Sequence, residues 1–414
     1  MPARPEAVLD RVVSETHIII GAGQAGAWAA VGMRQAGFAG RIILIGDEPV
    51  QPYERPPLSK AVLTAAEEPP PTYFHPKERY AELTIELLLS TRVEAIEPDS
   101  ARIRLQDGRS FGYDKLLIAT GGRARRLTIP GAEHALYLRT LEEARTIRAA
   151  LRRAGRITCI GAGVIGLETA ASAATRGATV TVLEALTAPM GRCVSPEGAR
   201  FVERLHRAAG VALRFGETVQ AIETAGDGYR VLCGDGTAVE ADLVLAGVGM
   251  ERNVELAGEA GVALDGGIVV DAGGRTSTPG IYAAGDVAAF FHPHYGRRIR
   301  LESWRHAQNH GIAVGRAMAG DATPYDEIPW FWTDQHGVNL QVAGLAADAA
   351  RTLVRSDQAR SFSAVHLGED GTIIAVTAAA NARDIRAGTA LIKARARPDP
   401  ARLADPSTPL QALR

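Results

Sequence analysis

The sequence predicts an α/β protein with two Rossmann-like dinucleotide-binding domains and a C-terminal α+β domain. Its 414 residues exceed the roughly 100–200 residues of one ordinary domain. One order of segments, an apolar run, a glycine turn, an alanine-rich stretch and a second apolar run, occurs twice. From about Ile328 the pattern changes to short alternating apolar segments, which are typical of β-strands.

The first repeat is predicted to bind one dinucleotide. The apolar run His17–Ile20 leads into a glycine turn, and the second apolar run is Arg41–Ile45. Glycine lets the backbone turn sharply and approach a pyrophosphate, while the helix that follows presents free N–H groups. An acidic residue about 20 positions further on is expected to bind the ribose. The residues predicted for this site are Gly21, Gly23, Gln24, Ala25, Gly26, Asp47 and, as second choice for the ribose, Glu48.

The second repeat, which opens at Arg156–Gly166 and continues with the run Ala178–Leu183, predicts a second dinucleotide. Glu184 ends that run, and a carboxylate there would bind both ribose hydroxyls and repel a 2′-phosphate. NADH is therefore preferred over NADPH, although Arg192 could soften the preference. The predicted site residues are Gly161, Gly163, Val164, Ile165, Gly166, Glu168, Glu184, Arg192, Gly247 and Gly249.

Two further segments predict how the chain passes between these domains. Tyr113–Gly122 resembles a buried strand closing on a Thr-Gly-Gly turn, and Thr276–Ala288 resembles a strand that ends at Gly285-Asp286 before a helix. This order indicates a discontinuous first domain. The predicted domains are residues 1–122 with 253–327, residues 123–252, and residues 328–414.

Composition argues against several classes of function. The formal net charge of −1 gives no general attraction for nucleic acid. No apolar run reaches the roughly 18 residues of a membrane span. Because the first apolar run leads directly into a glycine turn, neither a signal peptide nor an anchor is expected.

The cysteines and histidines do not predict a metal site or a redox-active dithiol. Cys159, Cys193 and Cys233 form no closely spaced pair, and reduced thiols in the cytoplasm are expected. The histidines between residues 292 and 310 lack acidic or cysteine companions at ligand spacing, so no metal is expected.

Several segments together resemble the glutathione-reductase-like two-dinucleotide flavoproteins, and among them the oxygenase-coupled ferredoxin reductases, which include the biphenyl-type, putidaredoxin and rhodocoxin reductases. The resemblance runs from about His17 to the C-terminus. It implies FAD at the first glycine turn and NADH at the second. It also implies an NADH:ferredoxin oxidoreductase that passes single electrons to a 2Fe–2S ferredoxin serving a ring-hydroxylating dioxygenase or a cytochrome P450. The segments that carry it are Arg55–Lys60, Leu138–Ala144, Gly163–Glu168, Glu302–Gly311 and Pro329–Gln335.

The resemblance also implies roles for individual residues. Lys60 is expected near the flavin, where the related disulfide reductases carry a cysteine pair, and Glu168 is expected to pair with it and position the nicotinamide. Asp286 resembles the aspartate that binds the flavin ribityl chain. An ordinary surface lysine and a glutamate at a helix N-terminus remain the alternatives. The other residues implied for the FAD site are Arg55, Val93, Ala119, Thr120, Gly121, Arg139, Gly285, Glu302, Ser303 and Trp304.

Aromatic and basic residues in the last third of the chain suggest a surface for an acidic ferredoxin. Trp304 and Trp330 are expected to act in electron transfer near the flavin edge, with Trp332 beside them. Equally, these tryptophans could be core residues. The arginines expected to attract the ferredoxin are Arg297, Arg298, Arg300 and Arg305, although a solvated surface is the alternative.

Two other functions compete with the ferredoxin reductase. An NADH oxidase or peroxide-handling flavoenzyme usually carries an active-site cysteine, which Arg55–Lys60 lacks. A redox-signalling protein like apoptosis-inducing factor carries the same lysine–glutamate pair. The absence of a targeting segment, a basic composition or a long third-domain insertion argues against it. The sequence leaves the choice between monomer and dimer open.

Overall fold

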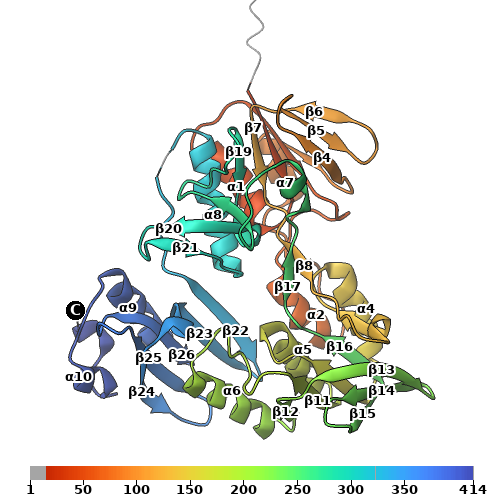
Figure 1. Ribbon diagram of the computed structural model, residues 1–414, viewed down its shortest axis with the longest axis vertical. Coiled ribbons are helices and arrows are strands. Elements are labelled where there is room, and N and C mark those ends of the chain that lie inside the picture. The colour runs from red at the N-terminus through yellow and green to blue at the C-terminus, as the bar shows by residue number, and fades with distance from the viewer. Residues whose placement is uncertain (1–14, 322, 414) are drawn as a thin grey trace, which may run out of the picture.

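The computed structural model describes residues 15–321 and 323–413. Figure 1 shows three parts, with the first Rossmann unit above and the second unit and the C-terminal part side by side below. The predicted fold class is confirmed, because two parallel sheets and one antiparallel sheet form the three parts.

The first Rossmann unit is built on a parallel five-stranded sheet of near-continuous apolar strands. Both faces of such a sheet are covered, which explains why runs such as Ile18–Ile20 are apolar at every position. In spatial order the strands are β19 (Ile281–Ala283), β7 (Lys115–Ile118), β1 (Thr16–Ile20), β2 (Arg41–Ile45) and β3 (Ile85–Leu88).

Two helices far apart in the sequence touch backbone to backbone on this sheet. They are α1 (Gln24–Gln35) and α8 (Trp304–Met318). A methyl group on Gly311 would lie 2.3 Å from the carbonyl oxygen of Ala25, and one on Gly315 would lie 2.2 Å from that of Ala29. Small residues on both helices therefore allow the close contact.

The second Rossmann unit repeats this design. Its parallel sheet has the order β12 (Ala212–Phe215), β11 (Thr179–Glu184), β10 (Arg156–Ile160), β16 (Leu243–Ala246) and β9 (Ala135–Tyr137). Its helices are α4 (Leu141–Leu151), α5 (Val164–Thr175) and α6 (Pro196–Ala208).

Each Rossmann unit also contains an antiparallel three-stranded meander just before its last central strand, which the sequence did not predict. The first consists of β4 (Val93–Glu97), β5 (Arg102–Leu105) and β6 (Ser110–Gly112). The second consists of β13 (Val219–Ala225), β14 (Gly228–Cys233) and β15 (Ala238–Ala241). Other short elements of the first unit are α3 (Lys77–Glu82), α7 (Glu255–Glu259) and β18 (Ile268–Val270). Helix α2 (Ala61–Thr64) instead packs against α4 and α5 of the second unit (Figure 1).

The two connections between the Rossmann units pair with each other. Strand β8 (Gly122–Ala124) runs antiparallel to β17 (Met250–Arg252), with Gly122 opposite Arg252. This pairing supports the proposed change of domain near residues 122 and 253.

The expectation of a helix directly after Asp286 is wrong. A single turn, Gly285–Val287, is followed by strands β20 (Ala288–His292) and β21 (Arg297–Ile299), and α8 begins only at Trp304. Ala288 and Phe290 are fully buried, and β20 pairs with β18 on one side and β21 on the other. Burial and pairing therefore outweigh the helical propensity of the alanines.

The C-terminal part is an antiparallel sheet covered by helices. Its strands have the order β22 (Trp330–Gln335), β23 (Val338–Gly344), β26 (Ile373–Ala379), β25 (Phe362–Leu367) and β24 (Arg351–Asp357). The helices α9 (Ala382–Lys393) and α10 (Pro400–Ala404) follow. Among the described residues of the whole chain, no helix has the length and apolar character to cross a membrane.

Candidate functional site

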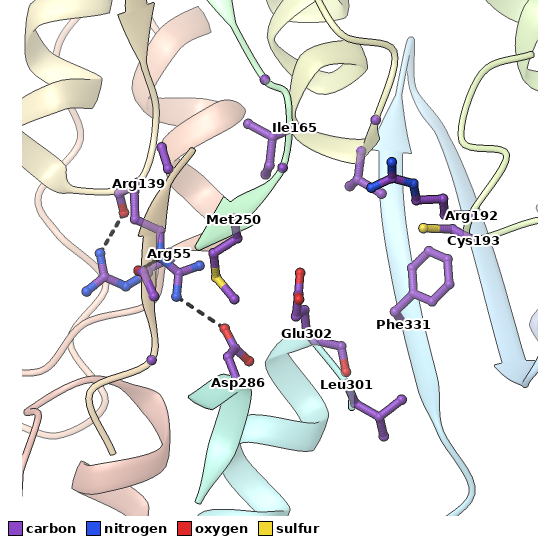
Figure 2. Close-up of a pocket in the computed structure, with 18 of the residues that line it drawn as sticks. Arg55, Arg139, Ile165, Arg192, Cys193, Met250, Asp286, Leu301, Glu302 and Phe331 are labelled. Atoms are coloured by element: carbon purple, nitrogen blue, oxygen red, sulfur yellow. Dashed lines mark hydrogen bonds and ion pairs between the residues drawn. The ribbon is translucent and has the colours of Figure 1, made fainter. Parts of the chain in front are cut away.

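A cavity of about 1480 Å³ lies where the three parts meet. Pockets for drug-sized ligands are commonly about 300–1,000 Å³, so this one is large enough for more than one such molecule. Figure 2 shows Arg55, Arg139 and Asp286 along one side and Cys193 and Phe331 along the other. Every site residue predicted from the sequence lines the cavity, with the exception of Gly26, Gly166, Gly285 and Val93.

In the first glycine turn, the two outer glycines are closely packed and the middle one is not. Gly21 has φ +109°, and a methyl group there would lie 2.2 Å from the carbonyl oxygen of Ala119. A methyl group on Gly26 would lie 1.9 Å from the oxygen of Gly21. Gly23, in contrast, has no atom of the described residues, apart from its neighbours along the chain, within 4 Å of its would-be methyl position. The outer two glycines therefore make the packing possible, and the middle one leaves space where a pyrophosphate would approach.

The second turn has the same geometry. Gly161 has φ +100°, and its would-be methyl lies 2.5 Å from the oxygen of Gly247. That of Gly166 lies 2.1 Å from the oxygen of Gly161. The nearest described atom to that of Gly163, apart from its neighbours along the chain, is the oxygen of Gly247 at 3.8 Å. The middle glycine of each turn therefore leaves space beside the same cavity.

Glu184 lies at the end of β11 with its carboxylate held by backbone donors. Ala162 N donates to Oε2 at 2.6 Å and Leu186 N donates to Oε1 at 2.8 Å. The carboxylate oxygens retain further acceptor capacity on the cavity side. This arrangement suits a diol and would repel a phosphate group.

The first Rossmann unit has a glycine, Gly46, in the place of that glutamate. A methyl group on Gly46 would lie 2.6 Å from the Cβ atom of Ala22, so no side chain fits. Of the two acids that follow, Glu48 already binds Arg55 at 2.7 Å and the Tyr53 hydroxyl at 2.7 Å. Asp47 is exposed at the cavity and makes no side-chain hydrogen bond within the described chain, which favours it for the ribose.

A network of two half-buried arginines lies at the other end of the first site. Arg55 donates to the backbone oxygen of Arg139 at 2.6 Å, and Arg139 donates to Asp286 Oδ2 at 3.2 Å (Figure 2). Burial lowers the pKa of Arg139 from its ordinary value. The other oxygen of Asp286 is buried without a partner among the described residues. A buried acceptor of this kind requires a donor, and a hydroxyl of a bound cofactor would supply one.

Lys60 and Glu168 form an ion pair at the centre of the site. Lys60 Nζ lies 2.9 Å from Glu168 Oε2, and the glutamate side chain is only 3% exposed. Ser59 Oγ donates to the same oxygen at 2.5 Å, and Thr333 Oγ1 donates to the other at 2.6 Å. The pair was predicted from the sequence, whereas Ser59 and Thr333 were not, although both lie inside segments that carry the resemblance.

Three tryptophans line the cavity together. Trp330 stacks on Trp332 with ring centroids 5.3 Å apart, and Trp304 meets Trp332 edge to face at 5.8 Å. Ser303 caps α8 through His306 N and donates to the Trp330 backbone oxygen at 3.2 Å. All three rings are half-buried and line the cavity, so they are neither fully buried core residues nor fully exposed ones.

Three of the four arginines expected to attract a partner are already paired. Arg297 binds Asp348, Arg298 Nη1 lies 3.2 Å from Asp265, and Arg305 Nε lies 3.7 Å from Glu327. Among the described residues, Arg300 has no ion-pair partner. The local surface is consequently less positive than the sequence suggests.

The predicted site residues outside the cavity have clear positions. Gly26 and Gly166 pack inside their turns, as described above, and Gly285 (φ +77°) faces Ala25. Val93 is buried in the apolar core of the first unit, where it pairs with Leu105. It does not line the cavity, so its implied place at the FAD site stays a prediction.

The clustered histidines pack in an aromatic core. His306 and His310 stack with ring centroids 4.9 Å apart, and Tyr325 lies 5.0 Å from His310. Burial lowers the pKa of His310 to about 3, so the ring is neutral. Within the described part of the chain, the one group with metal-ligand spacing is Glu217, Cys233 and Asp235. Arg214 already binds both of its carboxylates, at 2.8 and 2.9 Å.

A family model described as pyridine nucleotide-disulphide oxidoreductase matches residues 15–311. The chain belongs to this family. A second model, described as Reductase C-terminal, matches residues 330–414 of the oxidoreductase. These matches confirm the resemblance seen in the sequence.

Named relatives of the oxidoreductase match along almost its whole length. The ferredoxin–NAD(+) reductase component of the anthranilate 1,2-dioxygenase system of Burkholderia cepacia is 39% identical, over 97% of this chain and 99% of that protein. The crystal structure of the ferredoxin reductase for the CYP199A2 system of Rhodopseudomonas palustris has 38% identity and a TM-score of 0.93. That match covers 96% of this chain and 99% of the other. The covalent putidaredoxin reductase–putidaredoxin complex has 38% identity, a TM-score of 0.90, and coverage of 96% and 98%.

Proposed function

We propose that this oxidoreductase is an NADH-dependent ferredoxin reductase that binds FAD at the first glycine turn and NADH at the second. The observation that carries the proposal is that both turns open onto one cavity in which Lys60 pairs with Glu168, in place of a cysteine pair. Relatives of similar length that are named ferredoxin reductases support it.

The residues of the first site fit FAD. The space at Gly23 suits the pyrophosphate, and the free carboxylate of Asp47 suits the adenosine ribose. The unpartnered oxygen of Asp286 suits a ribityl hydroxyl. Arg139 neutralises Asp286 without occupying that oxygen. When bound, the flavin accepts a hydride and gives up its electrons singly, which is chemistry that the cofactor itself supplies.

The second site fits NADH. Gly163 leaves room for the pyrophosphate, and Glu184 presents acceptors to the ribose diol. Arg192 also lines the cavity, but it makes no ion pair with Glu184 among the described contacts. The carboxylate therefore remains the dominant charge at this position, which favours NADH over NADPH.

Lys60 and Glu168 orient the reacting groups. The ammonium of Lys60 would stabilise negative charge that develops on the reduced flavin, and the pair would hold the nicotinamide in place. Because Glu168 is buried and accepts from donors on both oxygens, its carboxylate is fixed in position. The half-buried Trp304 and Trp330 would shield this region from water and face the incoming electron acceptor.

The acceptor in this proposal is a 2Fe–2S ferredoxin that serves a dioxygenase or a cytochrome P450. One structural relative is a covalent complex of putidaredoxin reductase with putidaredoxin. Since three of the nearby arginines are paired, Arg300 is the arginine best placed to attract an acidic ferredoxin. The cytoplasm is the proposed location, because all three cysteines are free thiols.

An NADH oxidase that works through a cysteine is a weaker candidate. Cys193 is the one cysteine that lines the cavity, and burial raises the pKa of its thiol. A thiol held protonated is a poor nucleophile. The half-buried Cys193 is therefore a poor substitute for the missing cysteine pair.

The first experiment is to follow cytochrome c reduction by NADH and NADPH, with and without an added 2Fe–2S ferredoxin. Strong stimulation by the ferredoxin, with NADH preferred, is the expected result. Rapid oxygen consumption that the ferredoxin does not affect would instead indicate an oxidase. Slow reduction by NADH together with a change in oligomeric state would indicate a signalling protein.

A further inference from the structure

Glu168 is the end of a longer chain of hydrogen bonds. Its Oε2 accepts from Ser59 and Lys60, and its Oε1 accepts from Thr333 Oγ1 at 2.6 Å and from Asp334 N at 3.4 Å. A carboxylate paired with a lysine accepts hydrogen bonds and donates none. The hydroxyl proton of Thr333 must therefore point toward Glu168.

The direction of the hydrogen bond from Thr333 to Glu168 determines which atoms of Gln335 and His206 are donors and which are acceptors. With its proton committed, Thr333 Oγ1 can only accept from Gln335 Nε2, which lies 3.0 Å away. The amide oxygen of Gln335 then faces His206 Nε2 at 2.7 Å. Because an amide oxygen only accepts, the proton of His206 must be on Nε2.

The chain continues to a half-buried histidine. Burial lowers the pKa of His206 to about 4, so its ring is neutral near pH 7 and its Nδ1 is an acceptor. Nδ1 of His206 lies 3.1 Å from Nε2 of His336, which must then be the donor. Every donor from His336 to Thr333 therefore points toward Glu168.

We infer that Thr333, Gln335 and His206 are positioning residues, whose one-way hydrogen-bond chain holds the Glu168 carboxylate in place beside Lys60. His206 lies on α6, Gln335 and Thr333 on β22, and Glu168 on α5. The chain thus connects the C-terminal sheet to two helices of the second Rossmann unit. It deepens the proposed function and rests on it, because it gives the C-terminal part a role in the reaction with NADH.

Because its members are buried, the hydrogen-bond chain is sensitive to the loss of any one of them. His206 and Thr333 are fully buried and Gln335 is 2% exposed. Loss of one member leaves a buried polar group without its partner, which is more costly than loss of an exposed hydrogen bond. Since the amide of Gln335 has no readily exchanged proton to pass on, the chain orients Glu168 and does not conduct protons.

The test compares Thr333→Val, which keeps the side-chain shape but removes the donor, with Thr333→Ser, which keeps the hydroxyl. Flavin bleaching by NADH is followed under anaerobic stopped-flow conditions, without ferredoxin. We expect Thr333→Val to lower the limiting rate about tenfold or more, with a smaller change in NADH affinity, and Thr333→Ser to restore the rate. His366→Asn is the matched control, because His366 is fully buried and, within the described chain, its ring hydrogen-bonds with Thr352 and Thr377, away from Glu168.

A second readout needs no activity. Nitrogen-15 NMR of histidine-labelled holoprotein, assigned with His206→Asn, reports which ring nitrogen of His206 carries the proton. The Nε2–H form is expected in the wild type, and a mixture of forms in Thr333→Val. An Nδ1–H form in the wild type would overturn the inference, as would Thr333→Val bleaching at the wild-type rate. If NADH fails to reduce the wild type, the proposed function fails, and the tautomer still decides whether the chain exists.

Discussion

Arg297 and Asp348 join strand β21 of the first Rossmann unit to the C-terminal part through an ion pair at the edge of the cavity. The pair reduces the positive charge that this surface presents to a binding partner. The guanidinium of Arg297 is largely neutralised within the chain, and the same holds for Arg298 beside Asp265. Exposed pairs of this kind contribute little to stability, but they reduce the charge that a partner meets.

Charge reversal at Arg300 is therefore expected to impair ferredoxin turnover more than reversal at Arg298. Arg300→Glu should raise the KM for an acidic ferredoxin about tenfold at low salt, with the difference shrinking as salt increases. Steady-state kinetics at several ionic strengths measure this. The control is Arg230→Glu, because Arg230 is an exposed arginine on β14 of the second unit and does not line the cavity. Equal effects of Arg298→Glu and Arg300→Glu would contradict the expectation.

Replacing Lys60 is expected to slow the reaction with NADH. Lys60→Met should lower the limiting rate of flavin reduction about 100-fold, because the positive charge beside Glu168 is lost. Lys115→Met provides a control, since Lys115 is a half-buried lysine that binds the Met318 backbone oxygen away from the cavity. A Lys60→Met enzyme with the wild-type rate would exclude an electrostatic role for this residue.

The carboxylate of Glu184 is expected to set the choice of nucleotide. Glu184→Ala should weaken NADH binding about tenfold, a loss of about 1.4 kcal/mol, and should improve turnover with NADPH. Titration of the flavin spectrum with each nucleotide measures both changes. Glu223→Ala, at an exposed site on β13, should leave both affinities unchanged. An unchanged ratio of the two affinities in Glu184→Ala would assign the preference to other residues.

The contact between α1 and α8 leaves no space for an added methyl group. Gly311→Ala should lower the free energy of unfolding by about 1–3 kcal/mol, because the new methyl would meet the Ala25 oxygen. It should also weaken FAD retention, since Ala25 belongs to the first glycine turn. Denaturant unfolding and flavin release measure the two effects. Gly112→Ala is the control, because the nearest described atom to its would-be methyl, apart from its neighbours along the chain, is the Ala101 oxygen at 3.8 Å.

The buried, neutral His17 predicts that the folded protein loses stability in acid. His17 is fully buried against Phe38, and burial lowers its pKa to about 4. The unfolded state therefore binds more protons than the folded state between pH 6.5 and about 4, so stability falls as the pH falls through this range. His17→Phe should show a smaller loss of Tm over the same range. His134→Asn, at a partly exposed ring, should resemble the wild type.

The features that were predicted correctly from the sequence are those that depend on residues close together along the chain. The two glycine turns, Glu184 and the strand at Tyr113–Gly122 each depend on short local patterns, and the structure places them as expected. The pairing of Lys60 with Glu168 came from the family resemblance. The donors Ser59 and Thr333 were missed because they reach Glu168 only after three distant segments come together.

The wrong expectations have the same origin in long-range contacts. Ala288–His292 forms a strand because it pairs with β18 and β21, and the local sequence pattern does not indicate this pairing. The arginines near Trp304 looked free because their acidic partners, such as Asp348, come from other segments. In both cases the deciding neighbour lies outside the window of residues that a sequence pattern covers.

The backbone contact between α1 and α8 also bears on the order in which the chain acquires its structure during synthesis. Helix α1 forms from residues 24–35, but its partner is complete only at Met318. The segment from Ala135 to Ala246, which supplies the whole second parallel sheet, is continuous and can fold earlier on the ribosome. Nascent chains arrested soon after Ala246 has emerged should therefore resist protease in that segment. Flavin capture should begin only once α8 has left the exit tunnel.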